Sequence, residues 1–223
     1  MRNYGVFDIV GPVMIGPSSS HTAGAARLGQ MARLLAGGKV ESVEFQLHGS
    51  FAKTYRGHGT DKALLAGILG LSPDDERLHD AFALADEAGI AYRFTPVDLG
   101  EVHPNTVRFL LTVPGGHPLT MTGSSLGGGK VVVFSIDGLE VHFTGETPIL
   151  ITEHNDVPGV VSLLAALLYQ RDINIGNMRV NRTRPGREAY MYVELDGALP
   201  SEVLEQIRRI PGVKSATWLN ALG

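Results

Sequence analysis

The sequence predicts a chain of mixed α/β (α+β) class that is divided into two domains, residues 1–145 and 149–223. Three observations indicate this organisation. Apolar residues recur at helical spacing in some segments and alternate with polar residues in others, so helices and half-buried strands are both expected. The segment Thr-Gly-Glu-Thr-Pro at 144–148 is typical of a short linker. The predicted order of elements also changes across it.

Three helices are expected in the first domain. The first begins near Thr22, carries apolar residues at helical spacing and ends at a Gly-Gly pair. The second follows a Gly-His-Gly segment, with Thr60 as its predicted N-cap. The third has Ser72 as its predicted cap, Asp75 at the capping-box position and Gly89 at its end.

Strands are expected between and after these helices. Residues 43–47 and 107–113 alternate apolar and polar side chains, which is the period of a half-buried strand. Residues 131–136 and 139–143 flank Asp137-Gly138 and predict a hairpin with a tight turn. The first domain is therefore expected to place its helices early and antiparallel strands late.

The second domain has its own pattern of six elements. They are a strand at 149–152, a helix at 158–170 capped by Asn or Asp, strands at 175–182 and 189–195, a helix at 201–209 capped by Ser201, and a strand at 213–219. The order βαββαβ within about 75 residues predicts a ferredoxin-like split βαβ arrangement.

Composition excludes several classes of protein. Lys and Arg number 19 against 23 Asp and Glu, so no basic excess indicates a nucleic-acid partner. No apolar run is long enough to span a bilayer and no signal peptide is recognised, so a cytoplasmic protein is expected. The chain has no cysteine, which excludes disulfides and thiolate ligation of zinc or iron–sulfur clusters by this chain. The eight histidines show no metal-binding spacing, and no metal site is expected.

The segment Gly-Pro-Ser-Ser-Ser-His-Thr-Ala-Gly at 16–24 is the first candidate for chemistry. It places hydroxyls and free backbone N–H groups at the start of a helix, where an anion such as a carboxylate is stabilised. Four hydroxyl residues, Ser18, Ser19, Ser20 and Thr22, are therefore candidate anion ligands. The alternative is a generously supplied N-cap.

Two histidines are candidates for proton transfer. His58 lies between two glycines in Gly-His-Gly-Thr-Asp, where few side chains can pack on it, and histidine is the commonest general base. The alternative is a loop histidine at a turn that requires glycine. His103 and Asn105 flank a proline just before a strand, where a simple turn is also a sufficient explanation.

Two further segments could lie beside a ligand or a partner chain. Ser124 and Ser125 precede three successive glycines between two predicted strands, which permit close approach of another surface, although a flexible hairpin loop would also explain them. In the second domain a turn joins the first strand to the first helix, and capping alone could explain it. Its residues are Asn155, Asp156, Val157, Pro158 and Gly159.

Taken together and in this order, these motifs have a specific resemblance. The runs GPSSSHTAG, HGTD, HPN and SSLGGG, followed by a βαββαβ tail, resemble the β chain of the iron–sulfur-dependent bacterial L-serine dehydratase. The first domain is also similar to the allosteric substrate-binding domain of some phosphoglycerate dehydrogenases. The tail, with its DVPGVV turn, resembles an ACT domain, a module that commonly binds amino acids and pairs with other ACT domains.

The resemblance implies a reaction and a partner. A [4Fe–4S] cluster held by cysteines of a separate α chain would bind the hydroxyl of L-serine as a Lewis acid, while a base removes the Cα proton. The products would be pyruvate and ammonia. Homodimerisation through the ACT or the N-terminal domain is also implied.

The resemblance assigns roles as well. Ser18, Ser19, Ser20, His21 and Thr22 would hold the substrate. His58 would transfer the proton, with Thr60 and Asp61 orienting it or the substrate, and His103 is the rival base. Further substrate contacts would come from Asn105, Ser124 and Ser125, and regulatory amino-acid binding from residues 155–159.

Two other functions stay open from the sequence alone. One is a stand-alone amino-acid sensor that combines an ACT module with an anion-binding domain. The other is a phosphate-dependent enzyme that uses residues 16–22 as its anion site.

Overall fold

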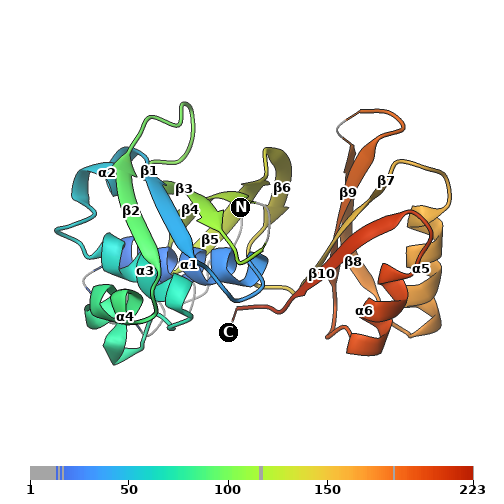
Figure 1. Cartoon of the computed structure of the whole chain (residues 1–223), viewed down its shortest axis with the longest axis horizontal. Helices are drawn as coiled ribbons and strands as arrows, with labels where there is room; N and C mark the ends of the chain where they lie inside the picture. Colours follow the sequence, from blue (N-terminus) through green and yellow to red (C-terminus); the bar gives the residue numbers. More distant parts are fainter. Residues whose placement is uncertain (1–13, 15, 17, 116–117, 183, 223) are drawn as a thin grey trace, which may run out of the picture. The chain divides into compact units, whose positions relative to one another are not determined.

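The computed structural model describes residues 14, 16, 18–115, 118–182 and 184–222 (Figure 1). The amino-terminal residues to which the signal-peptide expectation refers lie outside these ranges, as does Pro17 of the serine-rich motif. Two compact units are present, and the chain passes from one to the other between Thr144 and Gly145. The predicted mixed α/β class is confirmed.

The first unit is built on a six-stranded sheet whose order is β2-β1-β3-β4-β5-β6. β1 pairs in parallel with β2, and every other neighbouring pair is antiparallel. The register places Phe45 of β1 opposite Phe94 on one side and Phe109 on the other. The strands are β1 (Ser42–Leu47), β2 (Ala91–Pro96), β3 (Thr106–Thr112), β4 (Leu119–Gly127), β5 (Lys130–Ile136) and β6 (Leu139–Phe143).

Helices α1 and α3 lie against one face of this sheet (Figure 1). Their apolar side chains are buried with those of the strands, among them Leu28, Leu64 and Phe109. The helical elements are the π-helical turn η2 (Ser19–Ala23), α1 (Gly24–Leu35), α2 (Gly49–Thr54), α3 (Thr60–Leu69), the 3-10 helix η3 (Glu76–Asp80) and α4 (Ala81–Glu87).

α1 and α3 approach each other closely because two glycines meet at their crossing. A Cβ on Gly29 would lie 2.3 Å from the carbonyl oxygen of Leu64, and one on Gly67 would lie 2.1 Å from that of Ala26. Real Cβ atoms are excluded at such distances, so backbone packs directly on backbone. This contact sets the position of the start of α3 relative to the start of α1.

Several element predictions for the first unit are wrong in detail. The predicted third helix is two elements, η3 and α4, and Asp75 caps η3 while the Ser72 hydroxyl donates to Asp74. Thr60 is the first residue of α3 and not its N-cap. The N-cap of α3 is Gly59, whose φ is +69°. The segment around Ser124 is not a loop but the second half of strand β4.

The second unit has the predicted βαββαβ order. Its four antiparallel strands are arranged β10-β7-β9-β8, and α5 and α6 cover one face of them (Figure 1). The core between the layers includes Leu150, Leu164, Val193 and Ile207. The elements are β7 (Ile149–Asn155), α5 (Val160–Gln170), β8 (Ile175–Arg182), β9 (Glu188–Leu195), α6 (Ser201–Arg208) and β10 (Val213–Leu219).

The predicted caps of this unit are wrong. α5 has Gly159 at its N-cap and α6 has Pro200, so neither Asn155, Asp156 nor Ser201 caps a helix. The Asp156 carboxylate instead accepts a hydrogen bond from the backbone N–H of Gly186 at 2.9 Å.

Candidate active site

His21 is the centre of the candidate site in the first unit. The turn η2 begins after Ser18, whose hydroxyl oxygen accepts a hydrogen bond from the His21 backbone N–H at 3.2 Å. The imidazole Nδ1 lies 3.3 Å from the same Ser18 Oγ, and Nε2 lies 3.1 Å from the Oγ of Ser50. Both ring nitrogens therefore have a hydroxyl partner, which fixes the orientation of the ring.

The environment of His21 favours its neutral form. Burial lowers the pKa of the imidazole below its ordinary value, and the neighbouring charge of His58 lowers it further. A neutral imidazole has one N–H donor and one acceptor nitrogen, and the two serine hydroxyls can satisfy both.

His58 lies beside His21. The two rings meet edge to face with centroids 4.8 Å apart, and the His58 side chain is exposed. The loop that carries it runs from α2 to α3 and is held by the His58 backbone N–H, which donates to Thr54, and by that of Thr60, which donates to Tyr55. The positive φ of Gly59 turns the chain sharply into α3.

The two residues predicted to orient His58 face elsewhere. The Thr60 hydroxyl is buried without a hydrogen-bond partner among the described residues. The Asp61 carboxylate accepts from the backbone N–H of Lys62 and lines a pocket with aromatic walls rather than contacting His58.

The loop of His103 and Asn105 joins the site through its backbone. The carbonyl oxygen of Pro104 accepts from the backbone N–H of Ser50 at 2.8 Å, and that of Asn105 accepts from Ser125 at 2.9 Å. The Nδ1 atom of His103 accepts from the backbone N–H of Asn105, and its side chain is exposed. This loop therefore connects the start of α2, which carries Ser50, to β4.

The serine segment and the glycine-rich turn also meet. The Ser19 hydroxyl oxygen accepts from the backbone N–H of Gly128 at 3.2 Å, and a Cβ on Gly127 would lie 3.6 Å from the Oγ of Ser20. The guanidinium of Arg27 donates to the carbonyl oxygen of Gly129. The turn after β4 thus lies over the start of η2.

Three of the predicted hydroxyls are buried in the fold. The Ser124 Oγ lies 2.6 Å from the Thr106 hydroxyl, inside the sheet. Ser125 packs against α1 so closely that a Cβ on Gly24 would lie 2.0 Å from its Oγ. The hydroxyls of Ser125 and Thr22 are buried and have no hydrogen-bond partner among the described residues.

Sequence reasoning missed Ser50 and Phe51 at the start of α2. Ser50 supplies the hydroxyl on His21 Nε2, and the Phe51 ring meets the His21 ring at 5.3 Å between centroids. A signal was present, since His48-Gly49-Ser50 has the same residue types as His58-Gly59-Thr60, and both runs start a helix.

The turn at 155–159 in the second unit is held by backbone contacts. The Asn155 backbone N–H donates to the carbonyl oxygen of Gly212, and that of Asp156 donates to Arg187. The Asp156 carboxylate also lies 3.4 Å from the Arg182 guanidinium. Val157 is half exposed at 50%.

Neither unit offers a site for a metal or a membrane span in the part of the chain that is described. No three His, Asp or Glu side chains among those residues gather as metal ligands would. No helix there is long and apolar enough to cross a bilayer.

Two protein families match separate parts of the chain, and curated relatives match nearly all of it. The family "Serine dehydratase beta chain" matches residues 5–93, and the family "ACT domain" matches residues 149–212. The "Probable L-serine dehydratase, beta chain" of Bacillus subtilis (strain 168) is 41% identical over 217 residues, which cover 97% of this chain and 98% of that protein.

Two other relatives are informative. The "L-serine dehydratase, beta chain" of Peptoniphilus asaccharolyticus is 38% identical over 98% of this chain and 99% of its own length. A D-3-phosphoglycerate dehydrogenase of Synechocystis sp. (strain ATCC 27184 / PCC 6803 / Kazusa) is 26% identical over 86% of this chain, but over only 35% of its own length.

Proposed function

The chain belongs to the family of L-serine dehydratase beta chains, and from this premise we propose that it forms one wall of an active site that is completed by a separate cysteine-bearing α chain. The observation that carries the proposal is the grouping of Ser18, His21, Ser50 and His58 in a chain that beta chains match over 97–98% of its length. The reaction is the conversion of L-serine to pyruvate and ammonia.

The [4Fe–4S] cluster implied by the resemblance does not fit the residues of this chain. The sequence contains no cysteine, and iron–sulfur clusters are held by cysteine thiolates. No group of three His, Asp or Glu in the described ranges offers a substitute. The cluster is therefore proposed to be held by the α chain.

The start of η2 is the proposed binding site of the substrate carboxylate. Ser18, Ser19 and Ser20 are half-buried there. The 17 residues of η2 and α1, which begin at Ser19, direct the positive end of their dipole toward this site. Thr22 has a fully enclosed hydroxyl and supports the turn from behind in this proposal.

His58 is the proposed base for the Cα proton. Its ring is exposed where a substrate could approach, and it contacts the ring of His21, whose pKa is lowered by burial and by the charge of His58. The Cα proton passes to an imidazole nitrogen, the bond from the β-carbon to the hydroxyl oxygen breaks, and the departing hydroxide takes a proton back from the imidazolium to leave as water. The resulting aminoacrylate tautomerises and hydrolyses to pyruvate and ammonia. His103 is the rival base, with Asn105 beside it.

Histidine substitutions test this assignment in the assembled enzyme. With the chain and an iron-loaded α chain mixed under anaerobic conditions, His58→Ala is expected to lower kcat for pyruvate formation by about 10²–10⁴-fold, the usual contribution of a general base. His79→Ala, at an exposed position in η3, is the matched control and should leave kcat unchanged.

Full activity in His58→Ala would refute the assignment of the base. A loss confined to His103→Ala would transfer the role to the rival histidine.

The second unit is proposed to regulate the enzyme or to pair with its own copy. The supporting observations are the match to the ACT family and the position of residues 155–159 at the strand-to-helix turn. A regulatory amino acid would contact Asn155, Asp156, Val157, Pro158 or Gly159. Saturable L-serine binding by the chain without its partner, measured by calorimetry and lost on altering this turn, would support the sensing role.

A further inference from the structure

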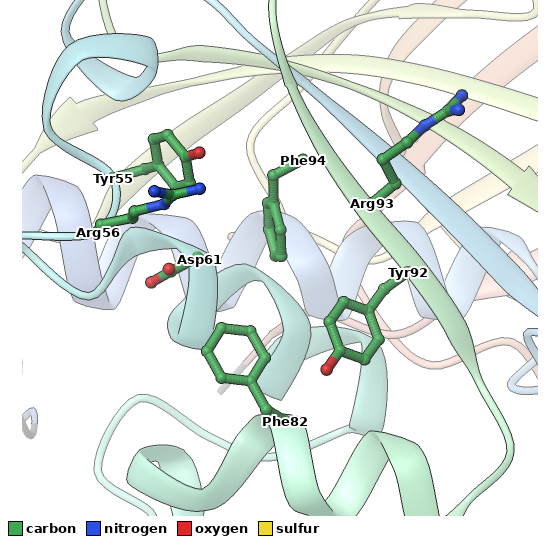
Figure 2. Close-up of a pocket in the computed structure, with 7 residues that line it drawn as sticks. All are labelled: Tyr55, Arg56, Asp61, Phe82, Tyr92, Arg93 and Phe94. Carbon is green, nitrogen blue, oxygen red and sulfur yellow. The ribbon is translucent and has the colours of Figure 1, made fainter.

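A pocket of about 470 Å³ lies in the first unit and is lined by aromatic and charged side chains (Figure 2). It opens between the end of α2, the start of α3, α4 and strand β2. This volume falls within the range of about 300–1,000 Å³ that is usual for small-molecule sites. None of the roles proposed above uses it.

Four aromatic side chains form its apolar walls. Phe82 of α4 and Tyr92 of β2 stack with centroids 5.5 Å apart, and Tyr55 lies 6.0 Å from Phe94 (Figure 2). Phe94 in turn stacks on the fully buried Phe45 at 4.6 Å. The Phe94 wall is therefore anchored in the core and is already in place before any ligand arrives.

Two groups of opposite charge lie at one end of the pocket. Asp61 and Arg56 are both on the Tyr55 side, and the Arg56 guanidinium lies 5.4 Å from the centre of the Tyr55 ring (Figure 2). Arg93 points away from the rings and forms an ion pair with Glu44. Within the described ranges, neither Asp61 nor Arg56 forms an ion pair at 4.0 Å or less.

The Asp61 carboxylate is short of partners. The residue is only 8% exposed, and its carboxylate accepts from the backbone N–H of Lys62 at 2.9 Å and from that of Asp61 itself, with no side-chain donor among the described residues. Burial raises the pKa of this carboxyl, while backbone hydrogen bonds and the charges of Lys62 and Arg56 oppose the rise. A cationic group of a ligand at this position would stabilise the buried carboxylate.

We propose that this pocket binds a free α-amino acid with a large apolar or aromatic side chain. Its ammonium group pairs with Asp61, its carboxylate pairs with Arg56, and its side chain packs against the aromatic wall that Phe82, Tyr92 and Phe94 form. Serine does not fit this description, because it is small and has no apolar surface to place against the rings. The site is thus separate from the proposed serine site and stands independently of it.

Titration calorimetry of the full chain with three probes tests the proposal. L-phenylalanine carries both charges, phenethylamine lacks the carboxylate, and 3-phenylpropanoate lacks the ammonium group. L-phenylalanine is expected to bind saturably, at least tenfold tighter than either analogue and tighter than L-serine.

Charge-removing variants locate the bound molecule. Arg56→Gln should weaken the binding of L-phenylalanine to the level of phenethylamine and leave the binding of phenethylamine unchanged. Asp61→Asn should weaken the binding of both amines. Tyr169→Ala removes an aromatic ring that is 84% exposed in the second unit, and it should change nothing.

Three outcomes would overturn the proposal. They are the absence of binding at millimolar L-phenylalanine, equal binding of the three probes, and binding that neither Arg56→Gln nor Asp61→Asn weakens. Because Arg56 is exposed, its substitution is compatible with folding, and a loss of binding there reports on the pocket.

Discussion

At the scale of single residues, the orientation of His21 depends on two serines from different elements. Ser18 comes from the start of η2 and Ser50 from the start of α2, and each is hydrogen-bonded to one ring nitrogen. The His58 ring lies edge to face against the His21 ring. Ser50 is therefore a positioning residue in our account, since it acts on the proposed base only through His21.

Removing the Ser50 hydroxyl is expected to impair turnover more than folding. Ser50→Ala deletes one hydrogen bond, a net loss of about 0.5–1.5 kcal/mol in the free energy of unfolding. We expect kcat of the assembled enzyme to fall about tenfold with little change in KM, corresponding to about 1.4 kcal/mol.

Ser50→Thr, which keeps a hydroxyl, should recover most of the lost turnover, and Ser72→Ala at an exposed position is the control. An unchanged kcat in Ser50→Ala would show that His21 needs no such support.

The lowered pKa of His21 predicts a dependence of stability on pH. In the unfolded chain this group titrates at the ordinary value of 6.5, and in the folded chain it titrates below it. Between these two pKa values the unfolded state binds more protons than the folded state. The contribution of His21 to the free energy of unfolding is therefore fully present above pH 6.5 and is lost as the pH falls through the folded pKa.

Urea unfolding at a series of pH values measures this contribution. The free energy of unfolding of His21→Gln should fall less on acidification than that of the unsubstituted chain. That of His79→Gln should fall as much as that of the unsubstituted chain. A parallel pH profile for His21→Gln and the unsubstituted chain would contradict the lowered pKa.

Motifs revealed only part of the candidate site. His58 stands out in the sequence because glycines flank it, and it does lie beside His21. Ser50 could not be identified as a site residue from the sequence, because its position depends on the pairing of β1 with β3. That pairing brings Pro104 onto the start of α2. The sequence did not show that Asp61 lines a pocket with aromatic walls, because the direction of a side chain at a helix start depends on the helix geometry.

At the scale of elements, the site depends on the direct packing of α1 on α3. Their starts carry the His21 and His58 segments, and Gly29 and Gly67 allow the two backbones to touch. A side chain at either glycine would force the helices apart and change the distance between the segments.

Gly67→Ala is expected to destabilise the first unit by about 1–3 kcal/mol, the usual cost of overpacking a tight interior. The added Cβ would lie 2.1 Å from the carbonyl oxygen of Ala26, a backbone atom that cannot move alone. Thermal or urea unfolding of the full chain provides the measurement.

Gly57→Ala is the matched control, because its Cβ would meet only Thr54 at an ordinary 3.8 Å. Equal stability of the two variants would contradict direct backbone contact between α1 and α3.

Elements were predictable where local chemistry determines them. The hairpin of β5 and β6 follows from Asp137-Gly138, and both residues adopt the positive φ that such a turn requires. β4 was mistaken for a loop because it contains Gly123, yet a Cβ there would lie 2.8 Å from Leu28 of α1. The glycine marks a close approach of a helix to the strand, which only tertiary structure reveals.

At the scale of the whole molecule, the absence of cysteine acquires its meaning from family membership. A beta chain of L-serine dehydratase that holds no thiolate ligand must obtain an iron–sulfur cluster from another chain, if one is required. The second unit has the fold that its βαββαβ order predicts, and it matches the ACT family.

Anaerobic titration of this chain with an iron-loaded, cysteine-bearing L-serine dehydratase α chain tests the central claim most directly. Pyruvate formation from L-serine is followed while the concentration of this chain is raised at a fixed concentration of the α chain. We expect no turnover from this chain alone and activity that rises to a plateau once the α chain is saturated. Turnover by this chain in the absence of any partner, or full activity of the α chain without it, would contradict the account.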